Sequence, residues 1–185
     1  MARRRHGRAR RVGGVLAILA LAVLGVGAGL VFFSSRDRAS VSDQAAGPGQ
    51  AFPDQGHEHL SPGQKPAVGY ASDPPTSGPH VPVAIRREAS TLSDDQLLQA
   101  LEQGNVVLLY GEARPPEPLP SLAQDVNQGA FSPDLAASGQ AVILGRRPGA
   151  RGVVALAWRH LLRVSDPRDP TLRAFADAWL GRGAG

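Results

Sequence analysis

The stretch DDQLLQALEQGNVVLLY, residues 94–110, decides the fold, because a helical pattern runs directly into a strand pattern. Ser93 precedes the helical part as an N-cap, and Gln96 three residues later completes a capping-box pattern. Gly104 suits the C-terminal turn of the helix. The continuous apolar run that follows has the length of a strand and predicts one that is covered on both faces.

The predicted helix carries a polar side, formed by Gln99, Glu102 and Gln103, opposite its leucines. Residues three and four apart on a helix are neighbours, so these side chains share one face. Such a face is either an ordinary solvated surface or the position of a site.

Apolar runs further along the chain predict the rest of a sheet. QAVILG (residues 140–145) and GVVALAW (residues 152–158) have strand patterns, and the turn-like link RRPGAR between them predicts a hairpin. A short helix is expected at residues 121–127, and this crossover allows parallel pairing of the strand at 105–110 with the strand at 140–145. PAVGY, residues 66–70, is a candidate short strand.

The last part of the chain predicts a helix that begins at Asp169, with Pro170 at its first position. An apolar stripe with helical spacing should pack this helix on the sheet; it consists of Leu172, Phe175, Ala176, Trp179 and Leu180. The expected fold class is therefore α+β: a small mixed sheet of three or four strands with two or three helices, preceded by one transmembrane helix.

The N-terminus predicts a membrane anchor. MARRRHGRARR carries six arginines and no acid, and the next apolar segment, residues 13–33, has no charged residue. At about 1.5 Å rise per residue, this segment spans roughly 30 Å as a helix, the thickness of the hydrocarbon core of a bilayer. The positive-inside rule then places the N-terminus in the cytoplasm and the rest of this single-pass membrane protein outside it.

Two alternatives to a retained anchor are an ordinary cleaved signal peptide and a twin-arginine export signal at Arg10 and Arg11. A signal peptide normally has an apolar region of about 7–15 residues and a small-x-small cleavage site, and no A-x-A pattern follows the apolar segment here. The expected organisation is a cytoplasmic basic tail (1–12), a signal-anchor helix in the lipid bilayer (13–33), a flexible stalk (34–55) and an extracytoplasmic domain (56–182).

Charge and cysteine content exclude several functions. Residues 1–38 hold eight of the twenty basic residues, so the remainder of the chain has a net charge of −3 and does not indicate nucleic-acid binding. The chain has no cysteine, which excludes disulfides, thiolate metal sites and cysteine nucleophiles.

Histidines in a Pro- and Gly-rich segment are the candidate metal ligands. His57 and His59 lie one residue apart, and His80 follows in SGPH. Imidazole is a common ligand of zinc and copper, provided that the fold brings the three rings together. The alternative is that they are loop histidines with hydrogen bonds to the backbone. His160, at the end of a strand, is expected to be structural or exposed.

A hydrolase is the third possibility, with Ser77, His80 and Asp73 as loose candidates for the reacting groups. No G-x-S-x-G elbow is present, and the bend at TSGPH is better explained as a turn in which Gly78 supplies an unusual backbone angle.

DQGHEHLSPGQKPAVGYASDPPTSGPHVP, followed by LLQALEQGNVVLLY and a late ALAW, resembles the domain of unknown function 3105 family of bacteria. That family has a G-x-x-H element, a PP-[TV]-S-G-P-H motif, a helix of the type H-S-L-E-H-G-x-V and a late A-x-W. The resemblance covers about residues 56–180. It implies a membrane-anchored, exported domain, and it names a fold rather than an activity.

The resemblance places His59 on the G-x-x-H histidine and His80 on the histidine of S-G-P-H. On the helix, Gln99 and Gln103 stand where the family has histidines, and Glu102 is retained. The resemblance therefore implies a site that has lost two imidazoles. Glutamine offers only a weak carbonyl donor to zinc or copper, so hydrogen bonds could have replaced the metal.

The sequence ranks three functions. The first is a non-catalytic binding or interaction module with an unknown extracytoplasmic protein partner. The second, close behind, is a protein that binds zinc or copper through His59, His80, His57 and Glu102. The third is a hydrolase.

Overall fold

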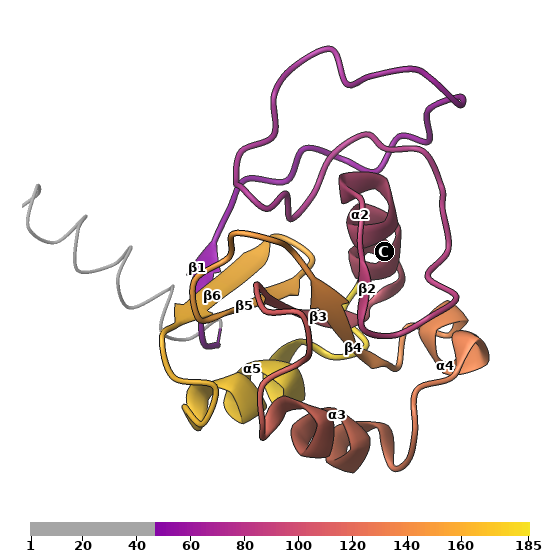
Figure 1. Ribbon diagram of the computed structural model, residues 1–185. Helices are drawn as coiled ribbons and strands as arrows, with labels where there is room; N and C mark the ends of the chain where they lie inside the picture. The colour runs from indigo at the N-terminus through magenta and orange to yellow at the C-terminus, as the bar shows by residue number, and fades with distance from the viewer. Residues whose placement is uncertain (1–46) are drawn as a thin grey trace, which may run out of the picture. The chain divides into compact units, whose positions relative to one another are not determined.

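A mixed sheet of six strands lies at the centre of the structure, a computed structural model that describes residues 47–185 (Figure 1). The strand order is β1-β6-β5-β3-β4-β2. In chain order the strands are β1 (Gln50–Ala51), β2 (Ser90–Thr91), β3 (Val106–Tyr110), β4 (Val142–Arg146), β5 (Val153–Ala157) and β6 (His160–Val164). The predicted tail, membrane anchor and most of the stalk lie outside the described residues. Within residues 47–185, no helix has the length and apolar character needed to cross a bilayer.

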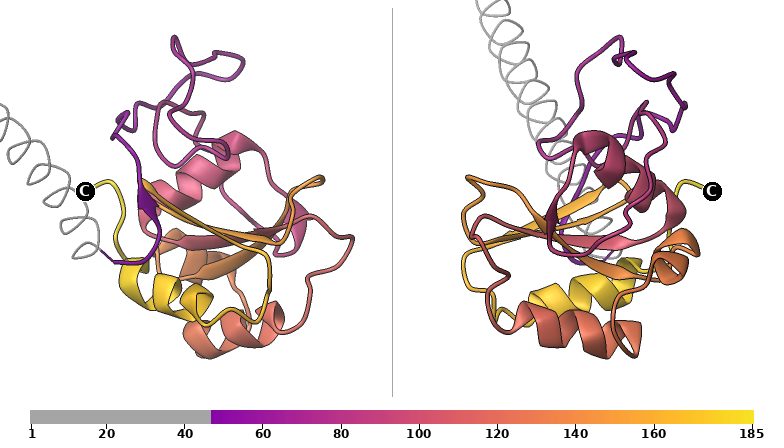
Figure 2. Two further views of the ribbon diagram at one scale, coloured as in Figure 1. Left: turned by 90° about the vertical axis from the view of Figure 1, so that its left-hand side faces the viewer. Right: turned by 45° about the vertical axis from the view of Figure 1, so that its right-hand side comes forward.

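Helices cover both faces of this sheet (Figures 1 and 2). They are α2 (Asp94–Gln103), α3 (Leu119–Asn127), α4 (Pro133–Ala137) and α5 (Thr171–Trp179). One apolar cluster joins α2 and α4 to one face, and a second joins α3 and α5 to the other. Because both faces are covered, all five residues of β3 are buried, as its apolar run predicts.

The two ends of α2 are set by the capping residues that the sequence predicts. The Ser93 side chain accepts a hydrogen bond from the Gln96 backbone N–H, and the Gln96 side chain accepts one from Ser93, which completes the capping box. Gly104 ends the helix at φ +107°, a conformation that favours glycine.

The predicted parallel pairing of β3 with β4 is confirmed, but the predicted hairpin between residues 140–145 and 152–158 is wrong. β4 pairs with β3 and β2, whereas β5 pairs antiparallel with β3 and β6. The six-residue link between β4 and β5 is long enough to pass the end of β3, since strands two positions apart are separated by about 10 Å. The tight hairpin is instead the one between β5 and β6, whose turn contains Arg159 at φ +64°.

Other differences concern short elements. The sheet has six strands rather than three or four, and the described residues contain four helices rather than two or three. Residues 66–70 form no strand, and β1 lies in residues that the composition assigned to the stalk, so the folded unit begins before residue 56. α5 begins at Thr171, and Asp169 accepts hydrogen bonds from the backbone and hydroxyl of that threonine.

The long segment between β1 and β2 runs over the α2 side of the sheet (Figure 2). Arg147, just after β4, holds it there by pairing with Asp73 of the segment and with Asp94 at the start of α2, both at 2.8 Å. This contact places the segment that contains the candidate histidines beside the helix that carries Glu102.

Candidate metal centre

Backbone hydrogen bonds between two loops place His59 beside His80. The two residues form a parallel bridge outside the named strands. The His80 N–H donates to the Glu58 carbonyl at 3.0 Å, and the Leu60 N–H donates to the His80 carbonyl at 2.8 Å. On the far side, the Val81 N–H donates to an Asp95 carboxylate oxygen in the first turn of α2 at 2.9 Å. These bonds fix both histidines relative to the helix.

Gly78 makes the bend that turns the His80 side chain inward. Its φ is +132°, and a Cβ at this position would lie 2.9 Å from two ring carbons of Tyr70. The Tyr70 hydroxyl donates to the Pro79 carbonyl at 2.9 Å, so the ring lies firmly against the bend. Burial, with smaller contributions from Asp95 and Asp94, raises the pKa of Tyr70, which keeps this donor protonated.

We expect Gly78→Ala to destabilise the protein by about 2–3 kcal/mol, because the methyl group meets the Tyr70 ring and the backbone angle disfavours a side chain. Gly63→Ala is the matched control, since Gly63 also has a positive φ, +87°, but open space around it. Urea unfolding followed by tryptophan fluorescence measures both. Equal losses for the two variants would show that the Tyr70 contact contributes nothing.

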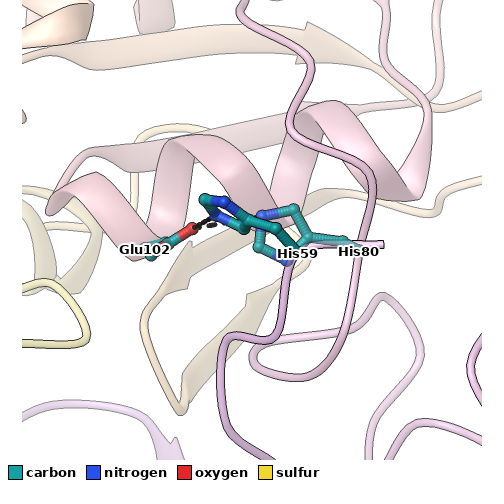
Figure 3. Close-up of side chains that lie close together, drawn as sticks. All are labelled: His59, His80 and Glu102. Carbon is teal, nitrogen blue, oxygen red and sulfur yellow. Dashed lines mark hydrogen bonds and ion pairs between the residues drawn. The ribbon is translucent and has the colours of Figure 1, made fainter. Parts of the chain in front are cut away.

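Glu102 faces these two histidines from the last turn of α2 (Figure 3). Its backbone is held by the C-terminal segment, because the Ala184 N–H donates to the Glu102 carbonyl at 2.9 Å. Its Oε2 atom lies 3.0 Å from His59 Nε2 and 3.2 Å from His80 Nε2. The imidazole rings lie edge to face, with centroids 5.4 Å apart.

The three side chains offer one donor atom each, and these atoms all lie within 4.8 Å of one another. A tetrahedral zinc ion with bonds of 2.0–2.1 Å sets its donors about 3.3 Å apart, close to the two separations measured to Glu102. Burial differs across the group: the exposed fraction of the side chain is 48% for His59, 17% for Glu102 and 0% for His80.

The tautomer of the neutral His80 ring is set by the contact of its other nitrogen, Nδ1. Nδ1 lies 3.0 Å from the Gly78 carbonyl oxygen, which can only accept, so Nδ1 carries a hydrogen. In the neutral ring the Nε2 lone pair then faces Glu102 Oε2. Although these atoms are 3.2 Å apart, their orientation does not make a hydrogen bond, and His80 Nε2 is a buried atom without a hydrogen-bond partner in the protein. A lone pair and a carboxylate oxygen this close repel each other unless a proton or another cation lies between them.

The arrangement matches the support that metal-binding histidines usually have. Such histidines donate their second ring N–H to a carbonyl or carboxylate, which fixes the tautomer and the ring orientation. His80 has this support from Gly78. Two imidazoles and one carboxylate form a donor set that suits a divalent transition metal.

Two other histidines lie outside this donor group. His57 is exposed, and its ring packs edge to face on Trp158 with centroids 6.4 Å apart. His160 is partly buried, its Nδ1 lies 2.9 Å from the Trp158 carbonyl oxygen, and its ring stacks on Trp179 at 3.6 Å. His160 therefore has structural contacts with Trp158 and Trp179.

The two glutamines on α2 differ in environment. Gln99 is 8% exposed, and its Oε1 atom has no hydrogen-bond partner in the protein. Gln103 is exposed to solvent.

Ser77, the candidate nucleophile, has a structural role. Its hydroxyl donates to the Pro53 carbonyl and accepts from the Gln55 N–H, both at 3.1 Å. Its proton is thus directed at a backbone oxygen rather than at an imidazole. Asp73 pairs with Arg147. These contacts do not assemble a nucleophile and its base.

Two residues that support the centre, Tyr70 and Ala184, are not among those that the sequence predicts. Tyr70 is an aromatic residue in a segment rich in Pro and Gly, and that contrast is the signal that could have identified it. Nothing in the sequence connects Ala184 with Glu102, because their hydrogen bond depends on where the chain goes after α5.

The sequence model of one protein family, described as Protein of unknown function (DUF3105), matches residues 61–184. The match includes His80 and Glu102 and confirms the resemblance seen in the motifs. No curated protein and no solved structure gave a significant match to the chain.

Proposed function

Because the chain belongs to the family described as Protein of unknown function (DUF3105), its own site must indicate its role, and we propose that it binds a divalent transition metal, zinc or copper. The ligands are His59, His80 and Glu102. The observation that carries this proposal is the approach of both Nε2 atoms to a single Glu102 oxygen, at 3.0 and 3.2 Å.

The burial of His80 strengthens the argument. Its ring is fully buried, and its Nε2 atom is directed at a carboxylate without a hydrogen bond to it. Buried polar atoms are normally paired, so an unpaired one in contact with a carboxylate marks a position for a cation. A metal ion would accept lone pairs from both imidazoles and charge from Glu102 at once.

The composition of the donor group limits the choice of metal. Magnesium and calcium prefer sites made entirely of oxygen ligands, whereas imidazole suits zinc and copper. At a site of this type, Cu²⁺ is expected to bind more tightly than Zn²⁺. The chain contains no cysteine, so thiolate ligands contribute nothing.

The location of the protein is a second part of this proposal. The arginine-rich tail and the uncharged segment at residues 13–33 support a single-pass anchor with the domain outside the cytoplasm. There the protein would bind metal at the cell surface or in the periplasm, and an extracytoplasmic protein partner would receive or supply it.

The decisive experiment compares metal binding by the full-length chain, purified without a histidine tag, with that of Glu102→Gln. We expect one equivalent of Zn²⁺ or Cu²⁺ by elemental analysis after dialysis. In calorimetry, Glu102→Gln should raise the Kd by about 100-fold, because an anionic ligand becomes a neutral amide.

Glu58→Gln is the matched control, because Glu58 is an exposed carboxylate next to His59 in sequence but not a member of the donor group. Its Kd should equal that of the parent. A folded parent that binds no metal, or a Glu102→Gln variant with unchanged affinity, would refute the proposal.

A further inference from the structure

Three buried polar side-chain atoms in residues 47–185 lack a hydrogen-bond partner within the protein: His80 Nε2, Gln99 Oε1 and Trp158 Nε1. All three belong to the α2 side of the sheet. Gln99 is part of α2, the His80 ring contacts Glu102 of that helix, and Trp158 belongs to the apolar cluster that α2 buries. Because unpaired buried polar atoms are uncommon, their concentration on one side of the sheet points to a polar ligand there.

Gln99 carries the unpaired buried atom that lies on the same helix as the proposed ligand Glu102. It precedes Glu102 by three residues on α2, and side chains at this spacing share a helix face, with Cβ atoms about 5–6 Å apart. Glu102 contacts both imidazoles, and Gln99 lies three residues before it on the same helix. Its Oε1 atom is a buried acceptor that requires a donor.

The number of protein ligands defines the type of site. In residues 47–185, the donor group contains three members, and no further carboxylate or imidazole joins it. Closed structural zinc sites use four protein ligands, whereas sites with three protein ligands keep a position for water or another exogenous ligand. A metal-bound water has hydrogens to donate, and Gln99 Oε1 is an acceptor without a donor.

We infer that the centre is an open metal site, which takes a water molecule or a small anion as an additional ligand, and that Gln99 accepts a hydrogen bond from the bound water. This inference rests on the proposed metal binding. Gln99 is a positioning residue in this arrangement and not a metal ligand. The Gln99 amide oxygen, which would be a weak metal ligand, thus holds the exchangeable ligand through a hydrogen bond instead of binding the metal.

The test uses Co²⁺ as a coloured substitute for Zn²⁺, in the full-length chain and in Gln99→Leu. We expect one bound Co²⁺ and a saturable change of its visible absorption when azide is added. Gln99→Leu should bind Co²⁺ with a Kd within threefold of the parent. It should bind azide about fivefold more tightly, because azide displaces a water that has lost one hydrogen bond.

Gln103→Leu is the matched control: it removes the exposed amide of the next turn and should behave like the parent in both titrations. If Co²⁺ binds and azide leaves the spectrum unchanged, the site is closed; this inference is then wrong and the proposed function stands. If Gln99→Leu weakens Co²⁺ binding tenfold or more, Gln99 is a ligand and its assigned role is wrong. If the folded chain binds no Co²⁺, Zn²⁺ or Cu²⁺, both proposals are wrong.

Discussion

The double variant His59→Ala/His80→Ala is expected to lose metal binding almost completely, with a Kd for Zn²⁺ at least about 10⁴-fold above that of the parent. Structural zinc sites with four ligands bind with about 10–16 kcal/mol, so one ligand contributes roughly 3–4 kcal/mol, or about 100- to 1,000-fold in affinity. The double variant removes both imidazoles and leaves Glu102 alone at the centre. A lone carboxylate holds zinc weakly. Competition with a chromophoric chelator measures the Kd of each variant.

Two comparisons separate lost ligands from lost structure. His59→Ala alone changes a half-exposed side chain and should raise the Kd about 100- to 1,000-fold with the fold unchanged. His57→Ala is the matched control, because this imidazole lies outside the donor group and its loss should leave the Kd unchanged. If His57→Ala weakened binding as much as His59→Ala, the ligand set assigned to the centre would be wrong.

Metal binding should also appear as stability. A ligand that binds only the native state stabilises it by about 2.7 kcal/mol when present at 100 times its Kd. Saturating Zn²⁺ should therefore raise the melting temperature of the parent, while the melting temperature of the double variant stays constant. The rise in melting temperature is expected because Zn²⁺ would join the loop that contains His80 to α2.

The parts of the fold that the sequence predicts are those with local causes. The Ser93 and Gln96 capping box and Gly104 are signals within a few residues of the helix they delimit, and α2 lies between them. The apolar run of β3 similarly predicts its burial. The predicted hairpin was wrong for a non-local reason. The pairing of β5 with β3 depends on the path of the link between β4 and β5, which passes the end of β3. β6 was not predicted, and it differs from β3 in burial: Leu161 is its one buried residue, and Arg163 is exposed.

The candidate site divides in the same way. The sequence identifies His59, His80 and Glu102 by residue type and by the resemblance of their motifs, but it does not give the distances between them. Those distances depend on the loop bridge between His59 and His80, which connects residues far apart in the chain. His57 lies outside the group, although it is only two residues from His59. Proximity in sequence was therefore a poor guide to membership of the site.

Asn105→Ala is expected to be the most destabilising single substitution proposed, with a loss of about 3–4 kcal/mol. Asn105 is 1% exposed and joins three segments through its side chain. Its amide donates to the Ala100 carbonyl at the end of α2 and to the Ala136 carbonyl of α4, and its oxygen accepts from the Ala141 N–H at 2.9 Å. Alanine would leave these buried backbone groups unpaired and open a small cavity. Urea unfolding of the metal-free protein measures the loss.

Asn127→Ala is the matched control, because Asn127 makes the same kind of contact with less burial. Its amide donates to the Val142 carbonyl and its oxygen accepts from the Val142 N–H, at the start of β4. Water can replace these bonds in part, so we expect a loss of about 1–2 kcal/mol. Similar losses for both asparagines would mean that burial does not set the effect. A clearly larger loss for Asn105 would show that this side chain, directly after the helix of Glu102, holds the end of that helix against the sheet.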